Sequence, residues 1–452
     1  MNNAFEQEYL DFGTSDFLSF TLSFLIIITS IFFYGKVQSY KIQFLLIINI
    51  FWSFLIIFNR LKLSNLQISW EWHEQILMSL VFFLPTIILF FLSGLVQRRN
   101  LLLISETFED PMQNIRFDAL LKLVSFLTYL SFSILLLDLI LNGVPIFDFS
   151  LGSVILNESR TNYRIPIFYS MSHQMLLLMA AILSIVQYKF NPAKKVLIIL
   201  LILYSIHSVL MVARGSLIYM LSIVFIAYFI FSQSSYLRKI TLSLIPVFSI
   251  LIGFSIIGAL RSSVTEGGFI DEFSFSIQNY GGFSENLPSP LAWAYGYGVI
   301  NFDSLIICIR EHANLGDSSF KTLQNFSPAL LSFFTEEQSE TVVESSVLFQ
   351  TLPYIGRFNL VTAFGALGYD YGWIGIYVFS SILIFSVPII FNKNFNELSL
   401  TRKSLFLYFS MTFLFITITN AIISSRFILF VFCLIVFSLM CKITKVYETK
   451  QS

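Results

Sequence analysis

The sequence predicts an all-α polytopic membrane protein with about eleven transmembrane helices and one large extracytoplasmic loop. Composition is the first observation: 56% of the 452 residues are hydrophobic and 12% are charged, against about 25% charged in an average soluble protein. The second is that apolar runs of ~20 residues, the length that crosses a bilayer, recur along the chain. The third is one long polar segment, residues 261–371, set between such runs.

The individual elements follow from the apolar runs taken in order. The predicted spans are 16–35, 42–59, 76–95, 119–141, 166–187, 195–212, 215–232, 240–260, 372–391, 404–419 and 425–441. A further apolar stretch, 290–309, carries Asn301, Asp303 and several glycines, so we expect a re-entrant or interfacial segment there. Three regions result: a membrane bundle of eight helices (1–260), the large loop with short or re-entrant helices (261–371), and three further helices with a tail (372–452).

The placement of Lys and Arg predicts the orientation, because cytoplasmic loops carry the excess of these residues. With the N-terminus outside, 17 of the 27 Lys and Arg lie on the inner side and 10 on the outer side. The large loop then faces the periplasm if the cell is Gram-negative, and the C-terminal tail lies in the cytoplasm. The net charge is zero, so no overall field attracts a nucleic acid or another polyanion.

The outer basic residues differ from the inner ones in kind. Eight of the ten are Arg, whereas twelve of the seventeen inner residues are Lys. Arg binds phosphate or carboxylate through paired hydrogen bonds, so the bias indicates an anion site outside the membrane. The alternative is that each Arg reaches lipid headgroups or pairs with a nearby acid. The arginines singled out for the anion site are Arg160, Arg164, Arg214, Arg261 and Arg357.

Some of these arginines have an informative local context. Arg160 and Arg164 are four residues apart, so a short helix would place them on one face; a solvated loop with Glu158 as a local partner is an equal alternative. Arg214 begins an apolar run, V-A-R-G-S-L-I-Y, where free helix amides would point at the same anion. Arg261 closes another run, which an ordinary charge at a membrane boundary also explains.

The large loop contains candidate residues for binding sugars and moving protons. Its stretch L-A-W-A-Y-G-Y-G-V-I-N-F-D offers rings for stacking, with Asn301 and Asp303 for hydroxyl groups; an aromatic belt at the membrane interface is the alternative. The candidate rings are Trp293, Tyr295 and Tyr297. Glu311 and His312 are adjacent, which makes them candidates for a general base, or ordinary surface residues. The Cys and His residues show no metal-ligand spacing, so no metal site is expected.

The stretch that closes the large loop is rich in glycine. It reads R-F-N-L-V-T-A-F-G-A-L-G-Y-D-Y-G-W-I-G-I-Y from Arg357 to Tyr377. Glycines allow close backbone approach to a ligand. The alternative is a helix-packing seam made by Gly368, Gly372 and Gly375, which needs no ligand.

These motifs resemble the oligosaccharide repeat-unit polymerases of bacterial surface polysaccharide synthesis (Wzy-type O-antigen polymerases). The overall plan of many spans and one large loop in the C-terminal half is similar. Arg357 and Gly368 fit the pattern of an arginine, ten residues and a glycine associated with that family. The Thr, Gly and aromatic-Asp-aromatic-Gly order of the closing stretch, the V-A-R-G-S-L-I-Y segment and Y-G-Y-G-V-I-N-F-D look like further parts of its pattern.

The resemblance implies a fold of the GT-C type and a metal-independent glycosyltransferase without cofactors in the bacterial inner membrane. Such enzymes join undecaprenyl-pyrophosphate-linked repeat units, and a chain-length regulator and a flippase are implied as partners. Arg214, Arg261 and Arg357, assisted by Arg160 and Arg164, would then bind the lipid pyrophosphate. The acceptor hydroxyl needs a base, and the implied candidates are Asp370, Glu311 and His312, with Asp303 also available.

Two other functions fit parts of this pattern. An O-antigen ligase shares the plan and the lipid-linked donor, but it transfers a finished chain to a lipid core. A polysaccharide transporter or flippase predicts charges inside the spans and pseudo-symmetric halves. Charge within the predicted spans is sparse, with Asp138 as the main case, and we detect no internal repeat. The sequence therefore favours the polymerase over the transporter.

Overall fold

The computed structural model describes much of the chain, and most of the described residues are helical. The described residues are 14–34, 40–62, 67–100, 115–141, 166–210, 214–231, 301–315, 363–390, 398–414, 425–444 and 446. The helices are α1 (Thr14–Tyr34), α2 (Tyr40–Asn59), α3 (Trp72–Leu80), α4 (Phe83–Asn100), α5 (Phe117–Leu141), α7 (Pro166–Val186), α8 (Pro192–Leu210), α9 (Arg214–Phe231), α13 (Asn301–Leu315), α17 (Ala363–Ile390), α18 (Leu400–Leu414) and α19 (Ser425–Ile443). Within these ranges no strand occurs, so the all-α class is confirmed.

The apolar runs became helices wherever the structure describes them. Helices occupy the predicted spans apart from 240–260, which lies outside the described residues. Four described helices are long and apolar enough to cross a bilayer, and a fifth crossing results if a bent pair is one span. Length and apolar composition thus make this a helical membrane protein.

One predicted span, 76–95, is not a single helix. The structure divides it into α3 and α4, which are bent by 45°. Pro85 lies in the first turn of α4. In a continuous helix its ring would clash with the carbonyl of Val81, and it has no N–H to donate. The chain therefore starts a new helix at Phe83.

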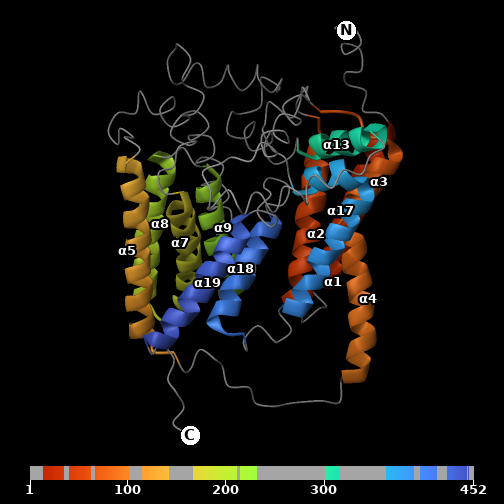
Figure 1. The fold of residues 1–452 in the computed structure, drawn as a ribbon. Coiled ribbons are helices and arrows are strands. Elements are labelled where there is room, and N and C mark those ends of the chain that lie inside the picture. Colours follow the sequence, from red (N-terminus) through yellow and green to blue (C-terminus); the bar gives the residue numbers. More distant parts are fainter. Residues whose placement is uncertain are drawn as a thin grey trace.

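The two ends of the large loop also form helices. The stretch predicted as re-entrant or interfacial contains the start of α13, which lies across one end of the bundle over α2 and α3 (Figure 1). We call this the α13 end. Helix α17 begins at Ala363, before the predicted span at 372, and Gly372 breaks it with φ 59° and ψ −148°. The predicted start of the span is thus the point where the helix breaks.

Among the described residues, the interior consists of two hydrophobic cores with α18 between them. One core joins α5, α7, α8, α9 and α19, and the other joins α2, α3, α13 and α17. Helix α18 belongs to both, because Leu407 and Met411 enter the first core while Phe406 and Phe413 enter the second. Figure 1 shows these groups on either side of α18.

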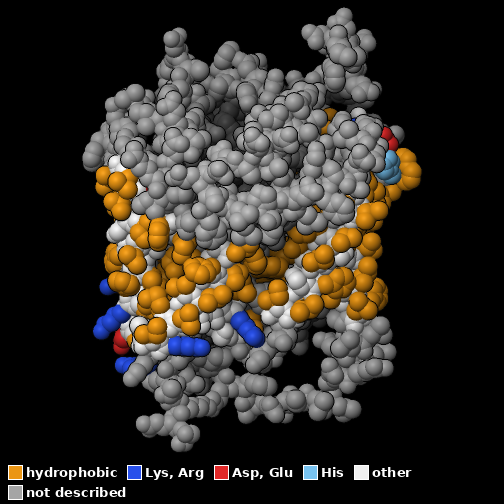
Figure 2. Space-filling model, viewed as in Figure 1, with side chains coloured by type: hydrophobic (Ala, Val, Ile, Leu, Met, Phe, Trp, Pro, Cys, Tyr) orange, Lys and Arg blue, Asp and Glu red, His pale blue; other side chains and the backbone are white. Residues whose placement is uncertain are grey.

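The surface consists of an apolar band with a basic edge. Figure 2 shows hydrophobic side chains across the visible side of the molecule, with Lys and Arg gathered along the edge opposite α13. Exposed apolar residues such as Phe91 on α4 and Ile382 on α17 form the band. The exposed basic residues on the starts or ends of helices there are Arg116, Lys122, Lys189, Lys194, Lys195, Arg402 and Lys442. We call this edge the basic end.

Candidate functional site

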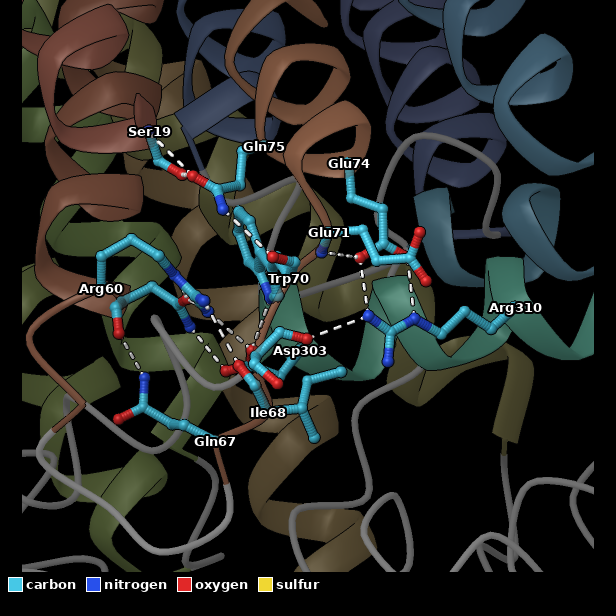
Figure 3. A network of polar contacts seen from close by, with 12 residues as sticks. Ser19, Arg60, Gln67, Ile68, Trp70, Glu71, Glu74, Gln75, Asp303 and Arg310 are labelled. Carbon is cyan, nitrogen blue, oxygen red and sulfur yellow. Dashed lines mark hydrogen bonds and ion pairs between the residues drawn. The ribbon is translucent and has the colours of Figure 1, made fainter. Parts of the chain in front are cut away.

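Polar side chains from α2, α3, α13 and the turn after α2 meet at the α13 end (Figure 3). Asp303, in the first turn of α13, lies at the centre and is 1% exposed. Its Oδ2 accepts a hydrogen bond from Asn59 Nδ2 at 2.7 Å. Its Oδ1 accepts hydrogen bonds from Arg60 Nη2 and Trp70 Nε1, each at 2.8 Å. The carboxylate is thus held by three donors, which come from the last residue of α2, from the turn after it and from the residues before α3.

The partner guanidinium of Arg60 is completely buried. Its carbon lies 3.7 Å from the centre of the Trp70 ring, so the cation rests on the indole face. Its Nε donates to Asn59 Oδ1 at 2.8 Å and its Nη1 donates to the Ile68 carbonyl at 3.3 Å. Such complete pairing is what a buried charge requires, since removing either partner leaves an uncompensated ion.

A second ion pair lies at the rim of the same cluster. Arg310 binds Glu74 through two parallel contacts, Nε to Oε1 at 2.8 Å and Nη2 to Oε2 at 2.7 Å. Its Nη2 also donates to the Ser69 carbonyl at 2.9 Å. Glu74 Oε2 in turn accepts the backbone N–H of Glu71 at 2.7 Å, which caps the start of α3. One carboxylate therefore connects the first turn of α3 to α13.

The charges in this cluster nearly cancel. Asp303 and Glu74 are matched by Arg60 and Arg310, which leaves Glu71 as the excess acid. Burial raises the pKa of the Asp303 carboxyl, and Arg60, Asn59 and Trp70 offset part of that rise. The hydrogen bonds to Glu74 raise the pKa of Arg310, which keeps it protonated. The pairing indicates that the cluster anchors α13 to the bundle.

Helix α13 also packs closely against α17. A Cβ added at Gly368 would lie 3.1 Å from Ile309 Cγ1 and 3.2 Å from Leu305 Cδ1. Around this contact the rings of Trp52, Phe302 and Phe364 form an edge-to-face cluster, with Trp52 4.8 Å from Phe302 and 5.6 Å from Phe364 between centroids. The packing interpretation of the glycine seam is therefore confirmed at Gly368.

The structure brings part of the predicted site together. Asn301, Asp303, Glu311 and His312 all lie on α13, Asp370 lies on the first part of α17, and Arg214 is the first residue of α9. Because α13 packs against α17, the helices that carry all three candidate bases are neighbours. The other predicted residues lie outside the described residues: Arg160, Arg164, Arg261, Trp293, Tyr295, Tyr297 and Arg357.

Sequence reasoning missed the residues that surround Asp303. Asn59, Arg60 and Trp70 are more than 230 positions away along the chain. Arg60 was recognisable as an outer arginine, but no pattern in one sequence connects it to Asp303. An acidic residue inside an apolar stretch was the available signal, since a charge there needs a partner.

A second buried polar group lies in the other core. His173 on α7 and His207 on α8 are distant in sequence, but their ring centroids are 5.2 Å apart. The Nδ1 of His173 is 2.9 Å from the Tyr204 hydroxyl, whereas neither ring nitrogen of His207 has a hydrogen-bond partner among the described residues. No group of three or more His, Cys, Asp or Glu that could hold a metal ion forms within the described ranges.

The arrangement at the α13 end is a closely paired polar cluster, with candidate acids and an imidazole on the two packed helices α13 and α17. Such a cluster can position groups for proton transfer outside the apolar band. No family model, curated protein or solved structure matches this chain.

Proposed function

We propose that this protein polymerises undecaprenyl-pyrophosphate-linked oligosaccharide repeat units into a surface polysaccharide, as a metal-independent glycosyltransferase. The resemblance of its motifs to repeat-unit polymerases motivates the proposal. The helical membrane architecture supports it, because the substrate is a membrane lipid. The proposed topology has about eleven spans, including residues 240–260, in a GT-C-type fold.

In the proposed orientation the α13 end faces outward from the bacterial inner membrane. The distribution of charge supports this orientation. Exposed Lys and Arg gather at the basic end, as at Lys194 and Arg402, and cytoplasmic surfaces carry such an excess. At the α13 end, Arg60 and Arg310 are instead neutralised by Asp303 and Glu74. The N-terminus is then periplasmic and the C-terminus cytoplasmic.

The observation that carries the proposal is that α17, which contains the family-like motif and Asp370, packs against α13, which contains Glu311 and His312. Gly368, which ten residues separate from Arg357, fits against α13 where a side chain would crowd Leu305 and Ile309. Gly372 adopts φ 59° and ψ −148°, a conformation that only glycine adopts readily. Both glycines thus have a structural role. The residues between them, Tyr369 to Tyr371, lie at the boundary of the span Tyr371–Ile390.

The proposed reaction uses this boundary. The acceptor hydroxyl forms a new bond to the anomeric carbon of the growing chain, and the bond from that carbon to the pyrophosphate breaks. The electron pair leaves with the pyrophosphate, whose charge the arginines stabilise. The hydroxyl proton passes to a base, for which α13 and α17 supply Glu311, His312 and Asp370. Sugars of the acceptor would lie on the residues of the large loop.

Single replacements of Arg357 and Arg214 test this proposal. We expect Arg357→Ala and Arg214→Ala to reduce the surface polysaccharide to single repeat units, because the pyrophosphate loses a fixed cation. Arg→Lys variants should recover little of the polysaccharide length, since Lys lacks the planar guanidinium that binds phosphate through two parallel hydrogen bonds. Gel electrophoresis of the polysaccharide, with immunoblotting for equal protein levels, measures the effect. Long chains of normal distribution in both Ala variants would contradict the assignment of these arginines.

A deletion strain and a purified-protein assay separate the polymerase from its alternatives. Loss of a polymerase leaves one repeat unit on the lipid core, whereas loss of a ligase leaves none. Purified protein given lipid-linked repeat units should release undecaprenyl pyrophosphate and lengthen the glycan. A transporter would produce neither product.

A further inference from the structure

The first turn of α3 presents an exposed aromatic side chain in a polar setting. Trp72 is 67% exposed, although Trp is among the side chains that gain most from burial. Its sequence neighbours are Glu71, whose side chain is 64% exposed, and His73, whose side chain is 43% exposed. Figure 2 shows acidic and histidine side chains over the start of α3, beside a hydrophobic one.

The three side chains form an ordered group. His73 Nδ1 lies 3.3 Å from Glu71 Oε2, and the Trp72 and His73 rings meet edge to face with centroids 5.9 Å apart. The backbone beneath is fixed, because the Glu71 N–H is bonded to Glu74 and Glu74 is bonded to Arg310. An indole face, a carboxylate and an imidazole are therefore presented together on a rigid helix start.

The local charge selects the kind of ligand. Near Trp72 lie the two carboxylates of Glu71 and Glu74 and one guanidinium, that of Arg310, which is paired with Glu74. The excess of negative charge disfavours phosphate groups, including those of lipid headgroups. It favours a neutral ligand with hydroxyl groups, which can donate to a carboxylate. The face of an aromatic ring carries negative potential, which suits the C–H face of a sugar.

We infer that Glu71, Trp72 and His73 form a carbohydrate-binding subsite that holds the repeat unit beside α13. This inference rests on the proposed function and names one of its contacts with the glycan. The ion pair of Glu74 with Arg310 fixes the distance between this subsite and the next two residues of α13, Glu311 and His312. A sugar bound to Trp72 would thereby be held at a fixed distance from two candidate bases.

Direct binding tests the subsite. The probe is the lipid-free oligosaccharide released by mild acid from the repeat-unit carrier lipid of cells that lack this protein. Titrated into the purified full-length protein in detergent, it should bind Trp72→Ala at least tenfold more weakly than wild type. Trp72→Phe should retain part of the affinity, and Glu71→Gln should weaken binding. The matched control is Phe91→Ala, since Phe91 is also 67% exposed but lies within the apolar band.

The outcomes separate the subsite from the proposed function. If wild type elongates glycans and Trp72→Ala binds the probe equally well, the subsite is wrong and the polymerase stands. If wild type neither binds nor elongates the glycan, both are wrong. A bilayer anchor is the competing role of Trp72. The tryptophan fluorescence of each protein is measured in vesicles of acyl-brominated phosphatidylcholine. If the fluorescence of wild type is quenched more than that of Trp72→Phe, and both bind the probe equally well, the subsite is wrong and Trp72 is a bilayer anchor.

Discussion

At the scale of single residues, the sequence predicted that Asp303 is unusual but did not identify its partners. Its acidic side chain in an apolar stretch marks it as unusual, and we predicted a contact with sugar hydroxyls. The structure surrounds it with Asn59, Arg60 and Trp70, so a sugar hydroxyl would have to displace one of these donors. That it has a partner was predictable from the cost of a buried charge.

The buried pair of Arg60 and Asp303 predicts a specific pattern of stabilities. Asp303→Asn should lower the free energy of unfolding by about 3–5 kcal/mol, because a buried guanidinium loses its counter-ion. Arg60→Met should have a similar cost. The double variant should recover much of it, since no uncompensated charge remains. Thermal unfolding in detergent, analysed as a double-mutant cycle, measures the coupling, and simple additivity of the two losses would contradict the buried pair.

The elements themselves were predictable because a bilayer imposes a length on each apolar run. The breaks within these elements and the contacts between them were harder to predict from the sequence. The break before α4 has a signal in Pro85, but proline also occurs within a helix without breaking it, as Pro388 does in the part of α17 that follows Gly372. The glycine pattern predicted a packing seam at Gly368, but no local pattern identifies α13 as its partner, because the choice of partner depends on the shapes of both helices.

The break in α17 predicts a strong preference for glycine at position 372. Its φ of 59° with ψ of −148° strains any residue with a Cβ, so Gly372→Ala should cost about 1–3 kcal/mol. It should also shorten the polysaccharide, because the motif beside it would shift. Ile374→Ala is the control, since Ile374 lies close by and is 76% exposed. Equal thermal midpoints for the two variants would argue against strain at Gly372.

For the whole molecule, the apolar band and the basic end predict accessibility from the two sides of the membrane. The native cysteines Cys308, Cys433 and Cys441 are buried, so labelling of an introduced cysteine can be distinguished from labelling of the native ones. A membrane-impermeant thiol reagent should label Glu71→Cys on cells with a permeabilised outer membrane. It should label Lys194→Cys only after the inner membrane is opened. The reverse pattern would invert the topology.

The position of α18 between the two cores has a consequence for biogenesis. Helices α2 and α7 are synthesised long before α18, yet α18 contacts both of them, and Leu405 packs against both cores. The early helices therefore enter the membrane before α18, which supplies buried residues to both cores, has been made. Packing of both cores is complete only after residues 400–414 have been made, so a chain that stops earlier would expose apolar surface of both cores to quality-control proteases.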